Sequence, residues 1–205
     1  MRIVDSLAIG DASPRELERG LGLSSNLLAH HLKTLADAGV VVRNRSEGDR
    51  RRTYLRLVPE ALAGLQTPPV MVAARVVFVC THNTARSQLA EAAWRQYSRI
   101  PVASAGTDPA ERVHPLTVSV ASRHGLRLPS GETAHVSDVA EADDLVIVVC
   151  DSAHESMPHR ARQLHWSVPD PVLLNTDIAF ESAFADVSQR VNRLAPMLAA
   201  ETGAS

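Results

Sequence analysis

The sequence predicts an α/β protein in which a parallel sheet with helices on both faces follows a small domain of helices and a hairpin. Two observations predict the sheet. The runs 76–79 and 145–150 are apolar at every position, which is typical of strands buried in a parallel sheet, and segments with helical spacing separate the strands. The third observation is the pair Pro68-Pro69, which stops both helix and sheet and marks a linker between the two parts.

Composition restricts the class of protein. Hydrophobic residues make up 45% of the chain but only seven residues are aromatic, so the cores must be aliphatic. Two cysteines, Cys80 and Cys150, do not make a disulfide framework in 205 residues. Asp5 argues against a signal peptide, and Arg75 interrupts the longest apolar run, which is too short to span a bilayer. We therefore expect a cytoplasmic protein with reduced thiols and no membrane partner.

The first forty residues predict three helices. Residues 2–9 carry apolar side chains at helical spacing, and the segment 13–16 is a capping box with proline at the first helical position. A third helix begins at Ser24 or Ser25, and Gly39 ends it.

Two strands are expected next, at 40–42 and 53–57, joined by the arginine-rich turn 43–52. A helix, a turn, a second helix and a basic hairpin are the elements of a winged helix-turn-helix domain. Such a domain would bind double-stranded DNA, with the third predicted helix in the major groove. That helix would offer Ser25, Asn26, His30 and Lys33 to the DNA. The wing would place arginines beside the phosphate backbone, namely Arg43, Arg45, Arg50, Arg51 and Arg52.

The stretch LGLSSNLLAHHLKTLADAGVV, at 21–41, resembles the arsenic-responsive ArsR-like regulators, and the resemblance covers roughly residues 2–60. It implies a transcription regulator and a homodimer, although few residues are available for the helices that usually form the dimer. The thiolate cluster by which many relatives sense arsenite is absent, because this part has no cysteine. A winged helix kept for protein contact, or as a vestigial fusion, is the alternative. His30 and His31 are adjacent and point to different faces of a helix, so we expect no metal there.

The stretch VVFVCTHNTARSQLAEAAW, at 76–94, carries the chemistry. A strand ends at Cys80, a loop of five residues follows, and a helix begins near Arg86. This geometry aims backbone N–H groups and a helix N-terminus at one point, which suits an oxyanion and a reactive thiolate. Arg86 could hold two oxygens of the same anion with its planar fork. We therefore expect a cysteine nucleophile that attacks a tetrahedral oxyanion.

The remaining elements alternate as an α/β sheet requires, and ligands are expected at the carboxyl ends of its strands. Strands are predicted at 101–107, 145–150 and 163–168. Helices are predicted at 87–97, 114–124, from about 153, and at 177–200.

Three motifs in order, CTHNTARS at 80–87, ASAGT at 103–107 and DP at 170–171, resemble the low-molecular-weight protein tyrosine phosphatase fold, and within it most closely the thiol-dependent arsenate reductases. The resemblance covers about residues 74–200. It implies that Cys80 is the nucleophile, that Arg86 clamps the oxyanion and that Asp170 is the general acid. The oxyanion-binding loop would comprise Thr81, His82, Asn83, Thr84, Ala85 and Ser87; Asn83 would hold its backbone and Ser87 would donate to the Cys80 thiolate.

The residues after Asp170 favour arsenate or phosphate over phosphotyrosine. Phosphatases of this fold usually carry aromatic residues there, whereas this chain has Pro171-Val172-Leu173-Leu174.

Thioredoxin-linked relatives use two further cysteines; one aligns with Cys150, but Met157 stands where the other would be. Either Cys150 attacks the arsenylated Cys80, or a small thiol does so directly, and Cys150 is then a buried apolar residue. The expected electron donor is external: mycothiol or glutathione with a redoxin, or thioredoxin.

These interpretations divide the chain into a DNA-binding domain at 1–66, a linker at 67–73 and a phosphatase or arsenate reductase-like domain at 74–205. No bound cofactor and no metal are expected, since His154, His159 and His165 lack a convincing ligand spacing with Cys150. Two alternatives stay open: a low-molecular-weight phosphatase, and a regulator that senses an oxyanion without turnover.

Overall fold

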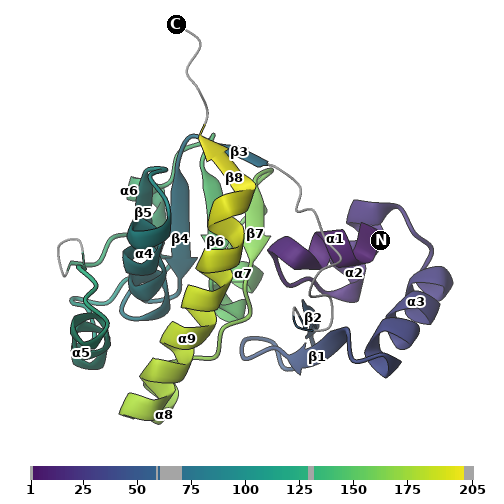
Figure 1. The fold of residues 1–205 in the computed structure, drawn as a ribbon, viewed down its shortest axis with the longest axis horizontal. Coiled ribbons are helices and arrows are strands. Elements are labelled where there is room, and N and C mark those ends of the chain that lie inside the picture. The colour runs from purple at the N-terminus through teal and green to yellow at the C-terminus, as the bar shows by residue number, and fades with distance from the viewer. Residues whose placement is uncertain (1, 59, 61–70, 129–131, 201–205) are drawn as a thin grey trace, which may run out of the picture. The chain divides into compact units, whose positions relative to one another are not determined.

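The computed structural model describes residues 2–58, 60, 71–128 and 132–200, which Figure 1 draws as a ribbon. The chain divides into two compact units, Met1–Pro69 and Val70–Ser205. Of the predicted linker, residues 67–70 lie outside the described residues. In the part of the chain that the structure describes, no helix is long and apolar enough to cross a membrane.

The first unit contains the predicted helices and hairpin. Its elements are α1 (Arg2–Ile9), α2 (Pro14–Leu21), α3 (Ser25–Asp37), β1 (Val41–Arg45) and β2 (Thr53–Leu57). The capping box at the start of α2 is confirmed, because the Glu16 amide donates to the Ser13 hydroxyl and the Ser13 amide donates to the Glu16 carboxylate. Gly39 follows α3 with φ +69°, a left-handed conformation that ends a helix at little cost for glycine.

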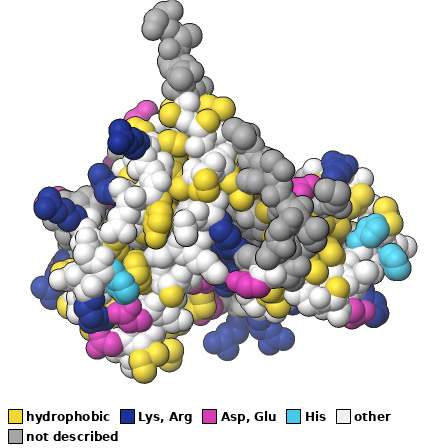
Figure 2. Space-filling model, in the orientation of Figure 1, with side chains coloured by type: hydrophobic (Ala, Val, Ile, Leu, Met, Phe, Trp, Pro, Cys, Tyr) yellow, Lys and Arg dark blue, Asp and Glu magenta, His cyan; other side chains and the backbone are white. Residues whose placement is uncertain are grey.

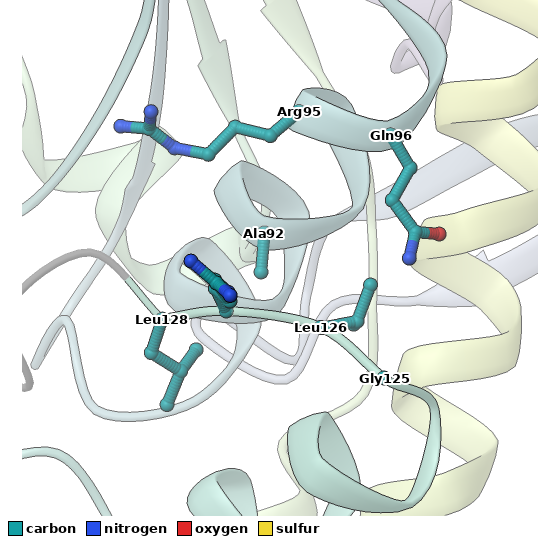
Figure 3. A pocket seen from close by; sticks show the side chains of 7 residues that line it. Ala92, Arg95, Gln96, Gly125, Leu126 and Leu128 are labelled. Atoms are coloured by element: carbon teal, nitrogen blue, oxygen red, sulfur yellow. The ribbon is translucent and has the colours of Figure 1, made fainter.

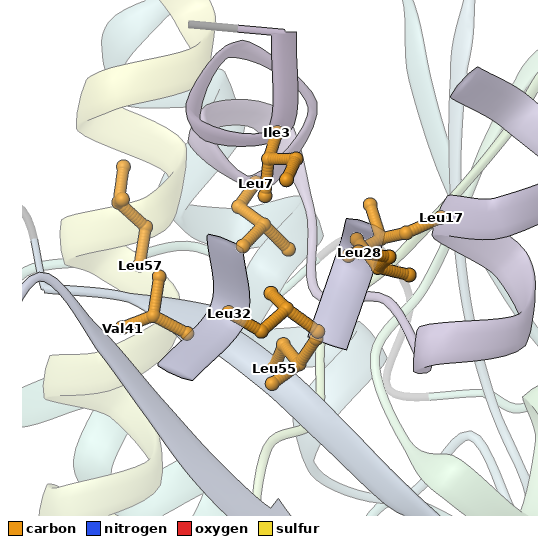
Figure 4. Close-up of a cluster of buried hydrophobic side chains, with 8 residues drawn as sticks. All are labelled: Ile3, Leu7, Leu17, Leu28, Leu32, Val41, Leu55 and Leu57. Atoms are coloured by element: carbon orange, nitrogen blue, oxygen red, sulfur yellow. The ribbon is translucent and has the colours of Figure 1, made fainter. Parts of the chain in front are cut away.

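The hairpin is longer than predicted. Residues 41–45 pair antiparallel with 53–57, so the first strand continues into the arginine-rich segment. The residue pattern hid the extension because this strand does not alternate: Val41 is buried, whereas Arg43 and Arg45, two and four positions later, are exposed. Figure 4 shows the aliphatic core that α1, α2, α3 and the hairpin share, built from Ile3, Leu7, Leu17, Leu28, Leu32, Val41, Leu55 and Leu57.

The second unit is the predicted parallel sheet. Its four strands lie in the order β5-β4-β6-β7, where β4 is Val76–Cys80, β5 is Val102–Gly106, β6 is Leu145–Val148 and β7 is Gln163–His165. The chain moves from β4 to β5 on one side and returns to β6 on the other, so the order reverses at β4. Ligands of α/β sheets bind where the order reverses, outside the carboxyl ends of the strands. The end of β4 is Cys80.

Helices cover the sheet as right-handed crossovers require. They are α4 (Arg86–Tyr97), α5 (Pro115–Arg123), α6 (Val136–Val139), α7 (Asp151–Ser156), α8 (Pro171–Leu174) and α9 (Asp177–Leu194). Figure 1 shows α4 and α9 side by side, and they are in contact. The crossovers β4-α4-β5 and β6-α7-β7 run in opposite directions across the sheet, which puts α4 and α7 on opposite faces.

Two sequence predictions were wrong at the ends of this unit. The last helix was predicted to reach residue 200, but it ends at Leu194 because Pro196 lies in the 3₁₀ turn Ala195–Met197 and cannot continue an α-helix. Residues 71–73 were assigned to the linker, but Met71–Ala73 form β3, which pairs in parallel with β8 (Leu198–Ala200). Neither strand shows the pattern alone, since each is only three residues long.

Candidate active site

Cys80 lies at the turn from β4 into α4, and its sulfur already has two hydrogen-bonding neighbours. The Asn83 amide donates to Cys80 Sγ at 3.2 Å, and Ser87 Oγ lies 3.1 Å from the same sulfur. The side chain is 3% exposed. The sulfur therefore lies against one backbone N–H donor and one hydroxyl at the start of the loop.

Most backbone carbonyl groups of the turn 80–85 accept hydrogen bonds from the segment 107–117. Thr107 N donates to Cys80 O, Asp108 N to Thr81 O, Ala110 N to His82 O, and His114 N and Thr117 Oγ1 to Thr84 O, whereas the Ala85 carbonyl accepts from Leu89 N in α4. Since that segment engages these carbonyls, we expect the loop amides to face the opposite side, as the Asn83 amide does where it donates to Cys80 Sγ. Such a concave run of N–H groups binds anions.

Asn83 is the residue that fixes this loop. Its φ is +53°, in the left-handed region that asparagine tolerates better than most residues. Its Nδ2 donates to Ser87 Oγ (2.8 Å) and Ser104 Oγ (3.1 Å), and its Oδ1 accepts from Gln88 Nε2 (3.2 Å) and the Ala134 amide (3.0 Å). The side-chain amide therefore ties the loop to α4, β5 and the segment before α6.

Gly106, the last residue of β5, lies directly behind the loop. A Cβ at this position would come within 2.6 Å of Thr81 O and 3.0 Å of Asn83 N, both of which are backbone atoms. We expect Gly106→Ala to destabilise the second unit by about 1–3 kcal/mol, the usual cost of overpacking. Urea unfolding followed by tryptophan fluorescence measures this, because both tryptophans, Trp94 and Trp166, belong to that unit.

The matched substitution is Gly20→Ala, where an added Cβ meets nothing within 4 Å. It should leave the tryptophan transition unchanged. A transition midpoint for Gly106→Ala equal to that of the parent chain would show that the loop moves aside freely and that glycine is not required.

Arg86 and Asp170 meet beside the loop although 84 positions separate them. Arg86 Nη2 lies 2.7 Å from Asp170 Oδ2, and Nη1 donates to the Val168 carbonyl at 3.1 Å. Asp170 caps α8, with its Oδ1 accepting from the Val172 amide. The arginine side chain is 7% exposed and that of Asp170 is 21% exposed, so the carboxylate forms the outer edge of the site.

The side chains beyond Asp170 leave this edge open. Leu173 and Leu174 are 76% and 73% exposed, and no residue of α8 is aromatic. His82 is also exposed, and its Nδ1 lies 2.9 Å from the Asp108 carbonyl. The His82 imidazole is therefore engaged by the Asp108 carbonyl. Because α8 offers no aromatic side chain on which an aryl ring could stack, this edge suits a small anion better.

Cys150 is the second thiol near the loop. It ends the β6 segment as the N-cap of α7, is 1% exposed, and places its sulfur 3.5 Å from Thr81 Oγ1. Burial raises the pKa of Cys150, an effect that the charge of Arg86 opposes. Met157, where a third thiol would be needed, is the C-cap of the same helix.

The described residues hold no metal-binding group near the loop, and a pocket beside α4 lies away from it. Among the described residues, no group of three or more His, Cys, Asp and Glu side chains could hold a metal ion. A pocket of about 550 Å³ (Figure 3) lies between α4 and the segment 125–128 and is lined by Ala92, Arg95, Gln96, Gly125, Leu126, Arg127 and Leu128. It borders the last turns of α4, whereas the loop precedes its first turn.

In the first unit, the residues predicted to meet DNA are all exposed. Ser25, Asn26, His30 and Lys33 lie on α3, and the five arginines lie on the hairpin. Figure 2 shows basic side chains gathered over the hairpin and histidines on the surface of α3. Arg51 differs from Arg50 in having a local partner: its Nε and Nη2 contact the Asp49 carboxylate at 2.9 and 3.1 Å.

Sequence reasoning missed the residues that support the loop from behind. Ser104 and Gln88 are buried polar side chains. In the sequence, Ser104 is marked only by its place in the ASAGT motif, and Gln88 only by its position directly after Ser87. Their function depends on contacts across 21 and 5 positions with Asn83, which no local pattern encodes.

Two family models match the chain. The low molecular weight phosphotyrosine protein phosphatase model matches residues 75–204, and the arsR family model of bacterial regulatory proteins matches residues 1–42. The curated relatives include an arsenate reductase of Brevibacillus brevis, 34% identical over 103 residues that cover 47% of this chain and 75% of the relative. An arsenate reductase of Bacillus cereus is 30% identical over 128 residues, 58% of this chain and 91% of the relative.

Solved structures agree with the fold. The arsenate reductase of Archaeoglobus fulgidus is 30% identical, aligns over 59% of this chain and 98% of its own length, and gives a TM-score of 0.53. The tyrosine phosphatase Wzb of Escherichia coli K30, 24% identical, aligns over 60% of this chain and 97% of its own length with a TM-score of 0.55. The second likeness bears on the fold alone.

Proposed function

The chain belongs to the low molecular weight phosphotyrosine protein phosphatase family, and we propose that it is a thiol-dependent arsenate reductase joined to an ArsR-like DNA-binding unit. The observation that carries the proposal is the grouping of Cys80, Arg86 and Asp170 around one anion-binding loop that is open at its outer edge. Relatives at 30% identity or more that are named arsenate reductases support arsenate as the oxyanion.

In the first step, the Cys80 thiolate attacks the arsenic of arsenate and forms a sulfur–arsenic bond. One hydroxyl group of the arsenate leaves as water after taking a proton from Asp170. Arg86 and the loop amides hold the remaining oxygens and stabilise their charge. Because Arg86 contacts Asp170 in the structure, the bound oxyanion must compete with this carboxylate for the guanidinium, which frees Asp170 to carry the proton.

In the second step, a thiolate attacks the sulfur of Cys80. A disulfide forms, the sulfur–arsenic bond breaks, and its electron pair stays on arsenic, which leaves as arsenite. We propose Cys150 as this thiol, since its sulfur contacts Thr81, the neighbour of Cys80. Two external thiols, or one dithiol, then reduce the Cys80–Cys150 disulfide through a mixed disulfide and are themselves oxidised to a disulfide; mycothiol or glutathione with a redoxin, or thioredoxin, would supply the two electrons.

The test is a donor panel run against two substrates. The purified chain is given arsenate with mycothiol, glutathione and a matching redoxin, or thioredoxin with its reductase, and arsenite is measured. The same enzyme is given an aryl phosphate. Arsenite formation that exceeds aryl phosphate hydrolysis supports the reductase. Phosphate release far above any arsenite formation would identify a phosphatase instead.

The second step should become faster as pH rises. Burial raises the pKa of Cys150, so this thiol stays protonated at pH values where an exposed cysteine is already partly ionised. The thiolate fraction, and with it the rate of arsenite release, should therefore increase from pH 7 to pH 9. Single-turnover release of arsenite from the arsenylated enzyme measures this, and a rate independent of pH in that range would exclude Cys150 as the attacking thiol.

For the first unit we propose DNA binding, because the α3 and hairpin residues lie exposed and an arsR family model matches there. Arg50 would contact a phosphate, whereas Asp49 neutralises Arg51. Arg50→Ala should weaken binding to the chain's own promoter and reduce the slope of log K against log salt by about 0.9, the value of one phosphate contact. Fluorescence anisotropy at several salt concentrations measures both.

The matched variant is Arg51→Ala, which should change the salt slope less. An unchanged slope for Arg50→Ala, together with an unchanged slope for Arg45→Ala, would remove the hairpin from the DNA interface.

A further inference from the structure

Three ionisable side chains that the proposed chemistry does not use are buried next to Cys150. Asp151 is 4% exposed, His154 is 9% exposed and His165 is 3% exposed. Asp151 is the first residue of α7, His154 lies in the same helix, and His165 ends β7. Ionisable groups at this depth cost free energy unless neighbouring groups compensate them, so their grouping requires an explanation.

These side chains contact one another and tie α7 to β7. His165 Nε2 lies 3.0 Å from Asp151 Oδ1, and the rings of His154 and His165 stack with centroids 4.1 Å apart at an angle of 8°. Gln163, at the start of β7, places Nε2 3.2 Å from His154 Nδ1. We call Asp151, His154, Gln163 and His165 the α7 anchor.

Helix α7 depends on such contacts for its position. It has only six residues, and its N-cap, Cys150, makes no side-chain capping bond. A helix this short is not stable by itself, so its place is set by what it packs against. Because Asp151 follows Cys150 directly, the contact between Asp151 and His165 fixes the point at which the thiol sits beside Thr81.

We propose that Asp151 and His165 are positioning residues for Cys150: they hold the first turn of α7 so that this thiol stays at the loop and out of solvent. The inference rests on the proposed function, in which Cys150 attacks the sulfur of Cys80. Loss of the contact lets the first turn of α7 open. The thiol then becomes accessible to solvent and spends less time within reach of Cys80.

Thiol labelling tests the first consequence. The chain has two cysteines, so Cys80→Ser leaves Cys150 as the only thiol. In that background, Asp151→Ala should raise the rate of iodoacetamide labelling at pH 8, followed by intact mass, by at least about tenfold. Asp151→Asn keeps the size of the side chain and one oxygen that can stay in contact with His165, and it should restore part of the protection.

The matched control is Asp144→Ala, which breaks another buried pair, with Arg75, at the opposite end of the β6 segment. Labelling in Asp151→Ala no faster than in Asp144→Ala would overturn the proposal. Low urea separates local from global opening: labelling through a local opening is nearly independent of urea, whereas labelling through global unfolding rises steeply.

Catalysis tests the second consequence. With both cysteines present, Asp151→Ala should lower kcat for arsenate reduction about tenfold and leave KM for arsenate unchanged, because the loop and Arg86 bind the anion. Faster labelling with an unchanged kcat would overturn the role in the reaction. If the parent chain forms no arsenite with any donor, the proposed function fails, while labelling still decides whether the α7 anchor holds Cys150.

Discussion

Replacing Cys80 with serine should abolish arsenite formation, lowering kcat by at least about ten-thousandfold. A serine hydroxyl is a poor nucleophile at neutral pH, and it cannot form a disulfide, so both steps fail. The loop itself should persist, because a hydroxyl can still accept from the Asn83 amide and exchange a hydrogen bond with Ser87. Steady-state arsenite production measures the loss, and calorimetric titration with phosphate checks that the anion still binds.

The companion variant is Cys150→Ser. It retains Cys80, so it should accumulate the arsenylated enzyme, visible as a mass increase, without releasing arsenite. Arsenite production by Cys80→Ser at the rate of the parent chain would show that Cys80 is not the nucleophile. Loss of phosphate binding together with activity would show instead that the substitution damages the loop.

The sequence predicted the strand, loop and helix around Cys80 because that geometry is local. Residues 76–80 are apolar at every position, Arg86 stands six positions after the cysteine, and helical spacing begins there. The hairpin and the three helices of the first unit were predicted for the same reason. Capping residues and glycines such as Ser13 and Gly39 act within one turn of the chain.

Contacts between distant segments were beyond any local pattern. The short pair β3–β8 joins residues more than one hundred positions apart, and neither segment is long enough to show a period. The same holds for the contact between Asp151 and His165: the sequence showed His165 only as a histidine without ligand spacing, and no local pattern pointed to Asp151. Their burial follows from the packing of α7 against the sheet.

Arg86→Lys is the substitution that separates anion clamping from charge alone. It keeps the positive charge but loses the planar guanidinium, which has enough N–H groups to bind two oxygens of the anion and to contact Asp170. We expect kcat/KM for arsenate to fall by about a hundredfold to a thousandfold, the usual cost of removing a donor that stabilises transition-state charge. Most of the loss should appear in kcat, since an ammonium still attracts the anion in the ground state.

Arg75→Lys is the matched control, because Arg75 also uses two nitrogens of its guanidinium, in this case for two bonds of 2.7 and 2.8 Å to the buried carboxylate of Asp144. This pair lies at the amino end of the sheet, away from the loop. Arg75→Lys should therefore lower the free energy of unfolding with little change in kcat/KM. Equal losses of kcat/KM in the two variants would mean that Arg86 affects activity only by stabilising the fold. Binding of the oxyanion would then have to be assigned to the loop amides alone.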